Sequence, residues 1–122
     1  MKRKTILKHS DFFMPMDAIC VRGERFLVKA KPTNALGNAR YGLVASKRVF
    51  KLAVERNRAK RLLRDWLAFN EDAMRPELEY VFYAHKNILE STRDAGRDDM
   101  ATTLAKVART FKYNERQKQI HG

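Results

Sequence analysis

Residues 52–70 carry the pattern that most limits the possible folds of this chain. Apolar side chains recur there at i, i+3, i+4, i+7 and i+8, which predicts one amphipathic helix. The stripe comprises Ala59, Leu62, Leu63, Trp66 and Leu67. Residues 18–32 and 40–47 before the helix, and residues 79–84 after it, are typical of short strands. A helix between two strands indicates a crossover connection and favours parallel pairing.

Two further helices are expected near the ends of the chain. Ser10 is a suitable N-cap for a short helix over residues 8–14, which Pro15 should end or kink. Helical spacing also recurs in the apolar residues Met100, Leu104, Val107, Ala108 and Phe111. The polar residues 113–122 are predicted to be a frayed tail. We therefore expect a single α+β domain over residues 1–122, with helices covering a small sheet.

The charge of the chain points to a polyanionic partner. Lys and Arg number 26 against 14 Asp and Glu, so the formal net charge of the 122 residues is +12. Nucleic acid is the leading candidate, and an anionic membrane surface is second. Cys20 is the only cysteine, which excludes an internal disulfide framework and a zinc site built from cysteines. A lone cysteine, no signal peptide and no long apolar run predict a cytoplasmic protein.

The predicted central helix and the residues before it are strongly basic. Residues 47–64 carry eight basic side chains against Glu55 alone. Like charges four residues apart repel each other by a few tenths of a kcal/mol, and Arg56, Lys60 and Arg64 form such a row. Because no local carboxylates compensate this repulsion, a bound polyanion is the better explanation than a merely solvated face. Arginine suits bidentate contacts to phosphate.

The segment SKRVFKLAVERNRAKRLLRD closely resembles the signature of the bacterial ribonuclease P protein subunit. In that family a strand ending in S-K-[KR] leads into R-N-R-x-K-R-x-x-R on a helix. The matching residues are Ser46, Lys47, Arg48, Arg56, Asn57, Arg58, Lys60, Arg61 and Arg64. The Asp11-Phe12 pair and the strands RYGLVASK and VFYA also lie where the family has them, so the resemblance spans about residues 7–112.

The resemblance implies an αβββαβα sandwich, a ribosomal-protein-like two-layer fold with a left-handed βαβ crossover. It also implies that the protein assists removal of the 5′ leader of precursor tRNA. The RNA subunit would perform this cleavage with magnesium, so no catalytic residue, metal site or cofactor is expected in the protein. The residues expected to bind the RNA subunit are Lys47, Arg48, Lys51, Arg56, Asn57, Arg58, Lys60, Arg61 and Arg64. The residues expected in a cleft for the single-stranded leader are Phe12, Phe13, Phe26, Val28 and His85.

Some features depart from the family pattern. Pro15 interrupts the first helix, and His85 follows Ala84 where the family usually has arginine. Alternation leaves open which face of the strands lines the cleft, and a polar strand end is an alternative role for His85.

Other function classes remain as alternatives. The main one is a non-enzymatic structural RNA-binding protein of the ribosomal type. DNA recognition ranks lower because no helix-turn-helix pair surrounds the basic helix. A membrane-surface helix ranks lower still, since Leu63 and Trp66 are needed in the core. We therefore expect the ribonuclease P RNA and the precursor tRNA leader as partners, and neither DNA nor a membrane.

Overall fold

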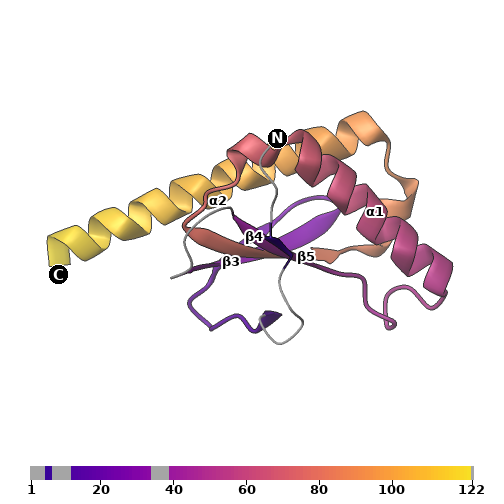
Figure 1. Cartoon of the computed structure of the whole chain (residues 1–122), viewed down its shortest axis with the longest axis horizontal. Helices are drawn as coiled ribbons and strands as arrows, with labels where there is room; N and C mark the ends of the chain where they lie inside the picture. Colours follow the sequence, from indigo (N-terminus) through magenta and orange to yellow (C-terminus); the bar gives the residue numbers. More distant parts are fainter. Residues whose placement is uncertain (1–4, 7–11, 34–38, 122) are drawn as a thin grey trace.

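The computed structural model describes residues 5–6, 12–33 and 39–121 and shows one sheet with a helix layer on one side (Figure 1). The strands are β1 (Thr5–Ile6), β2 (Ile19–Arg22), β3 (Phe26–Pro32), β4 (Arg40–Val44) and β5 (Leu78–Ala84). The helices are α1 (Ala53–Phe69) and α2 (Arg93–His121), with short 3₁₀ helices η2 (Glu71–Ala73) and η3 (Lys86–Glu90). The expected α+β class is confirmed.

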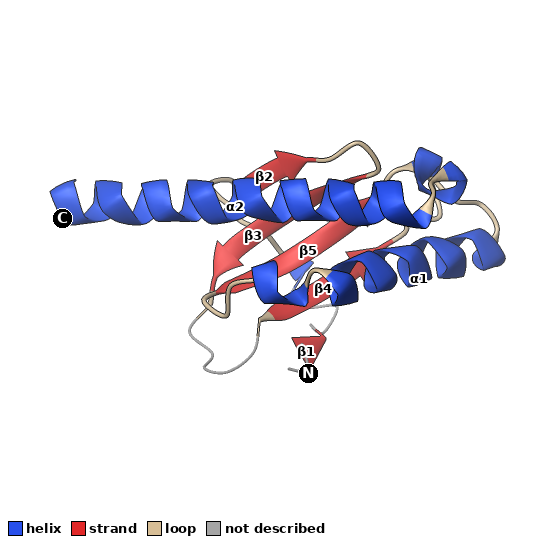
Figure 2. Ribbon diagram, turned by 90° about the horizontal axis from the view of Figure 1, so that it is seen from above, coloured by secondary structure: helices blue, strands red, loops and turns tan. Residues whose placement is uncertain are grey.

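The five strands follow the order β1-β4-β5-β3-β2 (Figure 2). β2, β3 and β5 pair antiparallel, whereas β4 pairs parallel with both β1 and β5. Because α1 lies between β4 and β5 in the chain, the predicted crossover and its parallel pairing are confirmed. The left hand of this crossover, which the family resemblance implies, stays a prediction.

The core lies between the sheet and the two α-helices. Phe26, Val28 and Ala30 alternate along β3 and are fully buried on this side of the sheet. The Trp66 ring of α1 packs over Phe26, with 6.4 Å between the ring centroids. Gly96 allows α2 to approach this tryptophan, because a Cβ atom at that position would overlap the Trp66 ring. The predicted apolar stripe of α1 therefore faces the core, as expected.

The hairpin between β2 and β3 is held against α2 by Asp99. The Asp99 carboxylate accepts hydrogen bonds from the backbone N–H groups of Glu24 at 3.2 Å and Arg25 at 3.1 Å. The residues 18–32, which were expected to be extended, therefore form two strands, β2 and β3, joined by a turn that begins at Gly23. Satisfying two turn N–H groups with one carboxylate fixes the hairpin on the helix layer.

The two ends of the chain differ from the prediction in different ways. Most of the helix expected over residues 8–14 lies outside the described residues, and the two-residue strand β1 was not expected. The frayed tail predicted for residues 113–122 is wrong, because α2 continues without interruption to His121. Lys, Glu, Arg and Gln dominate this segment and are good helix formers, and no Gly or Pro interrupts it before Gly122.

Candidate nucleic-acid interface

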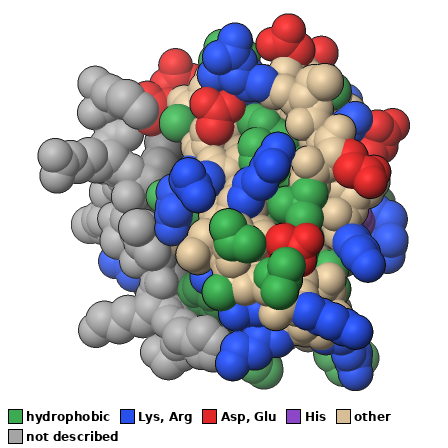
Figure 3. Space-filling model, turned by 90° about the vertical axis from the view of Figure 1, so that its right-hand side faces the viewer, with side chains coloured by type: hydrophobic (Ala, Val, Ile, Leu, Met, Phe, Trp, Pro, Cys, Tyr) green, Lys and Arg blue, Asp and Glu red, His purple; other side chains and the backbone are tan. Residues whose placement is uncertain are grey.

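The basic residues of α1 and its preceding loop form an exposed surface at one end of the molecule. We call this set the α1 basic surface: Lys47, Arg48, Lys51, Asn57, Arg58, Lys60, Arg61 and Arg64. All of them are exposed except Lys60, which is half-buried. Figure 3 views the molecule from this side and shows Lys and Arg side chains spread over it, among hydrophobic side chains and some Asp and Glu side chains. Binding of the RNA subunit by these residues stays a prediction, and Arg56, which was expected among them, is half-buried.

Ser46 and Arg56 shape the loop that presents this surface. The Ser46 hydroxyl accepts a hydrogen bond from the Val49 N–H at 3.2 Å, and the Ser46 carbonyl accepts one from Phe50 N–H at 2.8 Å. The Arg56 guanidinium donates to the carbonyl oxygens of Phe50 at 2.9 Å and Lys51 at 3.1 Å. Arg56 is half-buried, so its observed contacts position the loop, while its neighbours on α1 point outward.

The charge of the α1 basic surface is not neutralised within the described part of the chain. None of its side chains is among the ion pairs formed there. Asp65, an acidic residue of the same helix, is held by Arg97 through two hydrogen bonds of 3.1 and 3.2 Å. The Arg97 guanidinium also lies 4.2 Å from the centroid of the Phe69 ring. The surface therefore keeps its positive potential, which suits a polyanion.

The sheet face opposite the helices is a second candidate surface, which we call the open sheet face. Strand register places side chains from β2, β3, β4 and β5 on it in rows. These residues are Cys20, Arg22, Leu27, Lys29, Lys31, Arg40, Gly42, Val44, Glu79, Val81 and Tyr83. Phe12 lies against this face, because a Cβ atom at Gly42 would overlap the Phe12 ring. Cations, aromatic rings and backbone thus meet on one surface.

Two of the residues expected in the leader cleft are wrongly placed by the sequence prediction. Phe26 and Val28 are 0% exposed and belong to the core under the helices, so their side chains cannot stack on a bound base. The physical reason is that residues 26, 28 and 30 point to the covered side of β3, while residues 27, 29 and 31 point to the open sheet face. Alternation along β3 correctly predicts two faces, but it does not show which of them the helices cover.

The remaining cleft candidates lie at or beside the open sheet face. Phe13 is 74% exposed, and its carbonyl accepts a hydrogen bond from the Lys31 Nζ at 2.8 Å. This bond fixes the segment that carries Phe12 and Phe13 against β3. His85 directly follows β5 and is half-buried, and its backbone N–H donates to the Arg25 carbonyl at 3.0 Å.

Sequence reasoning missed the cations and the tyrosine of the open sheet face. Lys29 lies over the Tyr83 ring, with its Nζ 5.7 Å from the centroid, and burial raises the pKa of Tyr83. Arg40 lies at the same face on β4, and Lys31 is 3.7 Å from the Glu79 carboxylate. The signal was available in the sequence, because lysines at alternate positions of a strand mark the side that faces solvent.

Comparison with known proteins identifies the family. The Ribonuclease P family profile matches residues 1–108. The chain belongs to the ribonuclease P protein family. A protein of Desulforapulum autotrophicum named Ribonuclease P protein component is 28% identical over 109 residues, covering 89% of this chain and 92% of the relative. A protein of the same name from Chromobacterium violaceum is 37% identical over 84 residues, covering 69% of this chain and 68% of the relative.

Solved structures share the fold. The RNase P protein of Staphylococcus aureus superposes with a TM-score of 0.69 at 22% identity, covering 88% of this chain and 96% of that one. The RNase P protein of Thermotoga maritima gives a TM-score of 0.64 at 18% identity, covering 74% of this chain and 84% of that one.

Family membership supplies the general activity of the chain. As a ribonuclease P protein, it binds RNA, associates with the ribonuclease P RNA and takes part in precursor tRNA processing. Within the described residues, no helix is both long enough and apolar enough to span a membrane.

Proposed function

We propose that this chain holds the ribonuclease P RNA through the α1 basic surface and holds the 5′ leader of precursor tRNA on the open sheet face. The RNA subunit cleaves the leader, and the magnesium ions needed for cleavage belong to that RNA. The observation that supports the proposal is the presence of two unlike surfaces, one at the end of the molecule where α1 begins and one on the sheet face away from the helices. One is basic and uncompensated, and the other combines cations with aromatic rings.

The open sheet face has the composition that single-stranded RNA requires. Proteins that bind single strands with little sequence preference combine basic grooves with aromatic rings on which bases stack. Phe12, Phe13 and Tyr83 supply the rings, while Lys29 and Arg40 supply cations for the phosphates. Because the rings offer stacking and few base-specific groups, this arrangement favours leaders of many sequences.

The α1 basic surface suits a structured RNA and not a DNA groove. Its cations extend from the loop before α1 along the exposed side of the helix, so they follow a phosphate backbone over several turns of α1. We assign RNA and not DNA as the ligand, and binding should therefore depend on 2′-hydroxyl groups. We also propose that the protein acts in the cytoplasm, which the lone cysteine supports.

The proposal is tested by cleavage of a 5′-extended precursor tRNA at low magnesium concentration. Three samples are compared: the protein alone, the bacterial ribonuclease P RNA alone, and the two together. We expect efficient, leader-dependent cleavage only with both. Cleavage by the protein alone would contradict the assignment of chemistry to the RNA. Tight RNA binding without stimulation would instead favour a purely structural RNA-binding role.

A further inference from the structure

The C-terminal part of α2 forms a basic surface that the family comparison does not cover. The family match ends at residue 108, yet α2 continues to His121. Figure 1 shows this last part of α2 extending past the edge of the sheet as a straight helix. A preformed helix keeps its side chains in fixed relative positions, so it binds a ligand with little loss of conformational freedom.

The side of this segment that faces away from the sheet is rich in cations. Projection at about 100° per residue places five side chains within about 100° of one another, opposite the buried Val107 and Phe111. We call this set the α2 arm surface: Arg109, Lys112, Tyr113, Arg116 and Ile120. All five are exposed, with Tyr113 at 61% and Ile120 at 71%. Its three cations form no ion pair within the described residues.

Charge along α2 is segregated. The same outward side carries Asp94 and Asp98 in the first turns, whereas its charged residues beyond residue 108 are the cations Arg109, Lys112 and Arg116. Lys112 and Arg116 are four residues apart, so they repel each other by a few tenths of a kcal/mol. The nearest carboxylate on the helix, Glu115, lines the same hollow as Lys112 and Arg116. It forms no ion pair with either of them within the described residues. Like the α1 basic surface, this row therefore carries cations without ion-pair partners.

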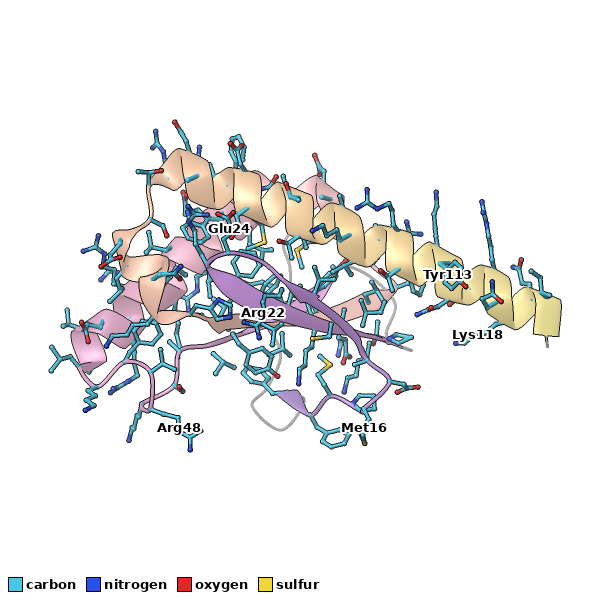
Figure 4. All side chains as sticks on the ribbon, turned by 180° about the vertical axis from the view of Figure 1, so that it is seen from behind. Met16, Arg22, Glu24, Arg48, Tyr113 and Lys118 are labelled. Carbon is cyan, nitrogen blue, oxygen red and sulfur yellow. The ribbon has the colours of Figure 1, made fainter. Side chains whose placement is uncertain are left out.

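We propose that the α2 arm surface is a second binding site for the phosphate backbone of the ribonuclease P RNA. Both α-helices lie on the same side of the sheet, so one large RNA lying over the helix layer reaches both basic surfaces. Figure 4 shows Arg48, in the loop before α1, at one end of the molecule and Tyr113 and Lys118 toward the other. The proposal rests on the association of this family with its RNA and does not depend on where the leader binds.

RNA explains the α2 arm surface better than a membrane does. An interfacial membrane helix needs a continuous apolar stripe. Here Tyr113 and Ile120 are the two large apolar side chains of the surface, and they lie about 10 Å apart along the helix with Arg116 between them. An isolated tyrosine among cations suits contact with a sugar or base beside the phosphates.

The test compares two charge-matched double variants of the full-length protein. Arg109→Ala/Arg116→Ala removes two cations from the α2 arm surface. Arg93→Ala/Lys118→Ala removes two exposed cations from other positions of α2 and serves as the control. Affinity for the ribonuclease P RNA is measured across a range of salt concentrations, and circular dichroism checks that both variants fold alike.

For Arg109→Ala/Arg116→Ala we expect the affinity for the ribonuclease P RNA to fall on the order of tenfold or more at 0.1 M salt. The slope of log affinity against log salt concentration should decrease by up to about two units. The control should change little. Equal losses of affinity in the two variants would show that only the net charge of the protein matters, which would overturn the proposal. A loss seen only for precursor tRNA binding to the assembled complex would move the contact to the substrate and also overturn it. Leader-dependent binding measured in the same samples tests the open sheet face separately.

Discussion

On both sides of the sheet an aromatic ring packs against a glycine, but the two rings differ in burial. On the covered face, Trp66 packs against Gly96 and is completely buried between α1 and α2. On the open sheet face, Phe12 packs against Gly42 and stays half-buried. An aromatic ring on a glycine stabilises the fold where helices cover it. On the open sheet face, where no α-helix of the described residues lies, the same contact leaves the Phe12 ring half-buried.

The largest expected loss of stability comes from a substitution on the covered face. Gly96→Ala places a methyl group into the Trp66 ring, so we expect the free energy of unfolding to fall by about 3 kcal/mol, even though alanine favours a helix. Urea denaturation measures the change. Ala105→Gly, at an exposed position of the same helix, is the control and should cost about 1 kcal/mol from helix propensity alone. A loss for Gly96→Ala no larger than this control would show that the helices adjust freely around Trp66.

A second variant separates RNA binding from folding on the outer side of the helix layer. Arg58→Ala/Arg61→Ala removes two exposed cations of the α1 basic surface without touching the core. Affinity for the ribonuclease P RNA should fall, and the slope of its salt dependence should decrease by up to about two units. The free energy of unfolding should stay within about 0.5 kcal/mol of the parent value. An unchanged slope would mean that these side chains do not touch phosphate.

The open sheet face is tested by separating leader binding from tRNA binding. Phe12→Ala should weaken the binding of precursor tRNA by about 1–3 kcal/mol, the range for loss of one stacked base. The binding of mature tRNA should be weakened much less. Gly42→Ala should produce a similar selective loss, because the new methyl group displaces the Phe12 ring. The double variant should lose less than the sum of the two, since both changes remove one contact. Equal losses for precursor and mature tRNA would remove Phe12 from the leader site.

The smallest expected effect concerns a tyrosine of the covered face at high pH. Burial raises the pKa of Tyr80 to about 12, and its hydroxyl accepts a hydrogen bond from the Arg75 N–H at 2.8 Å. The folded state therefore keeps this proton at pH values where the unfolded chain releases it. Tyr80 should contribute stability that is fully present below about pH 10 and lost as the pH rises toward 12.

The measurement is the free energy of unfolding at about pH 9 and pH 11. The parent protein should lose about 1 kcal/mol more over this interval than Tyr80→Phe, which has no proton to release. An identical pH dependence of the free energy of unfolding in the two proteins would contradict the raised pKa of Tyr80. Tyr83, on the open sheet face, is the comparison residue, because burial also raises its pKa but its side chain is only half-buried.

Much of the helix layer could be predicted from the sequence because its pattern is local. Ala59, Leu63, Trp66 and Leu67 follow one helix face, and all four are buried in the core. The ordered signature from Ser46 to Arg64 identified the family because it fixes residue types at many positions. Neither inference required knowledge of distant contacts.

The open sheet face was harder to predict because it depends on which side of the sheet the helices cover. Alternation along β3 separates Val28 from Lys29 but does not by itself state which of the two faces the core. The distinguishing signal is charge, because Lys29 and Lys31 favour solvent whereas Phe26 favours the core. The hairpin contact of Asp99 was beyond sequence reasoning, because it joins residues more than seventy positions apart.

The measurement that tests the account most directly uses the lone cysteine of the chain. Cys20 is exposed and pairs in register with Lys29 on the open sheet face, so a photoreactive group attached to it reports what binds there. With the assembled complex and a precursor tRNA, we expect cross-links to the leader. A Cys20→Ser/Arg61→Cys variant, labelled in the same way, should instead cross-link to the ribonuclease P RNA. Cross-links from Cys20 to that RNA and none to the leader would contradict the division of labour between the two faces.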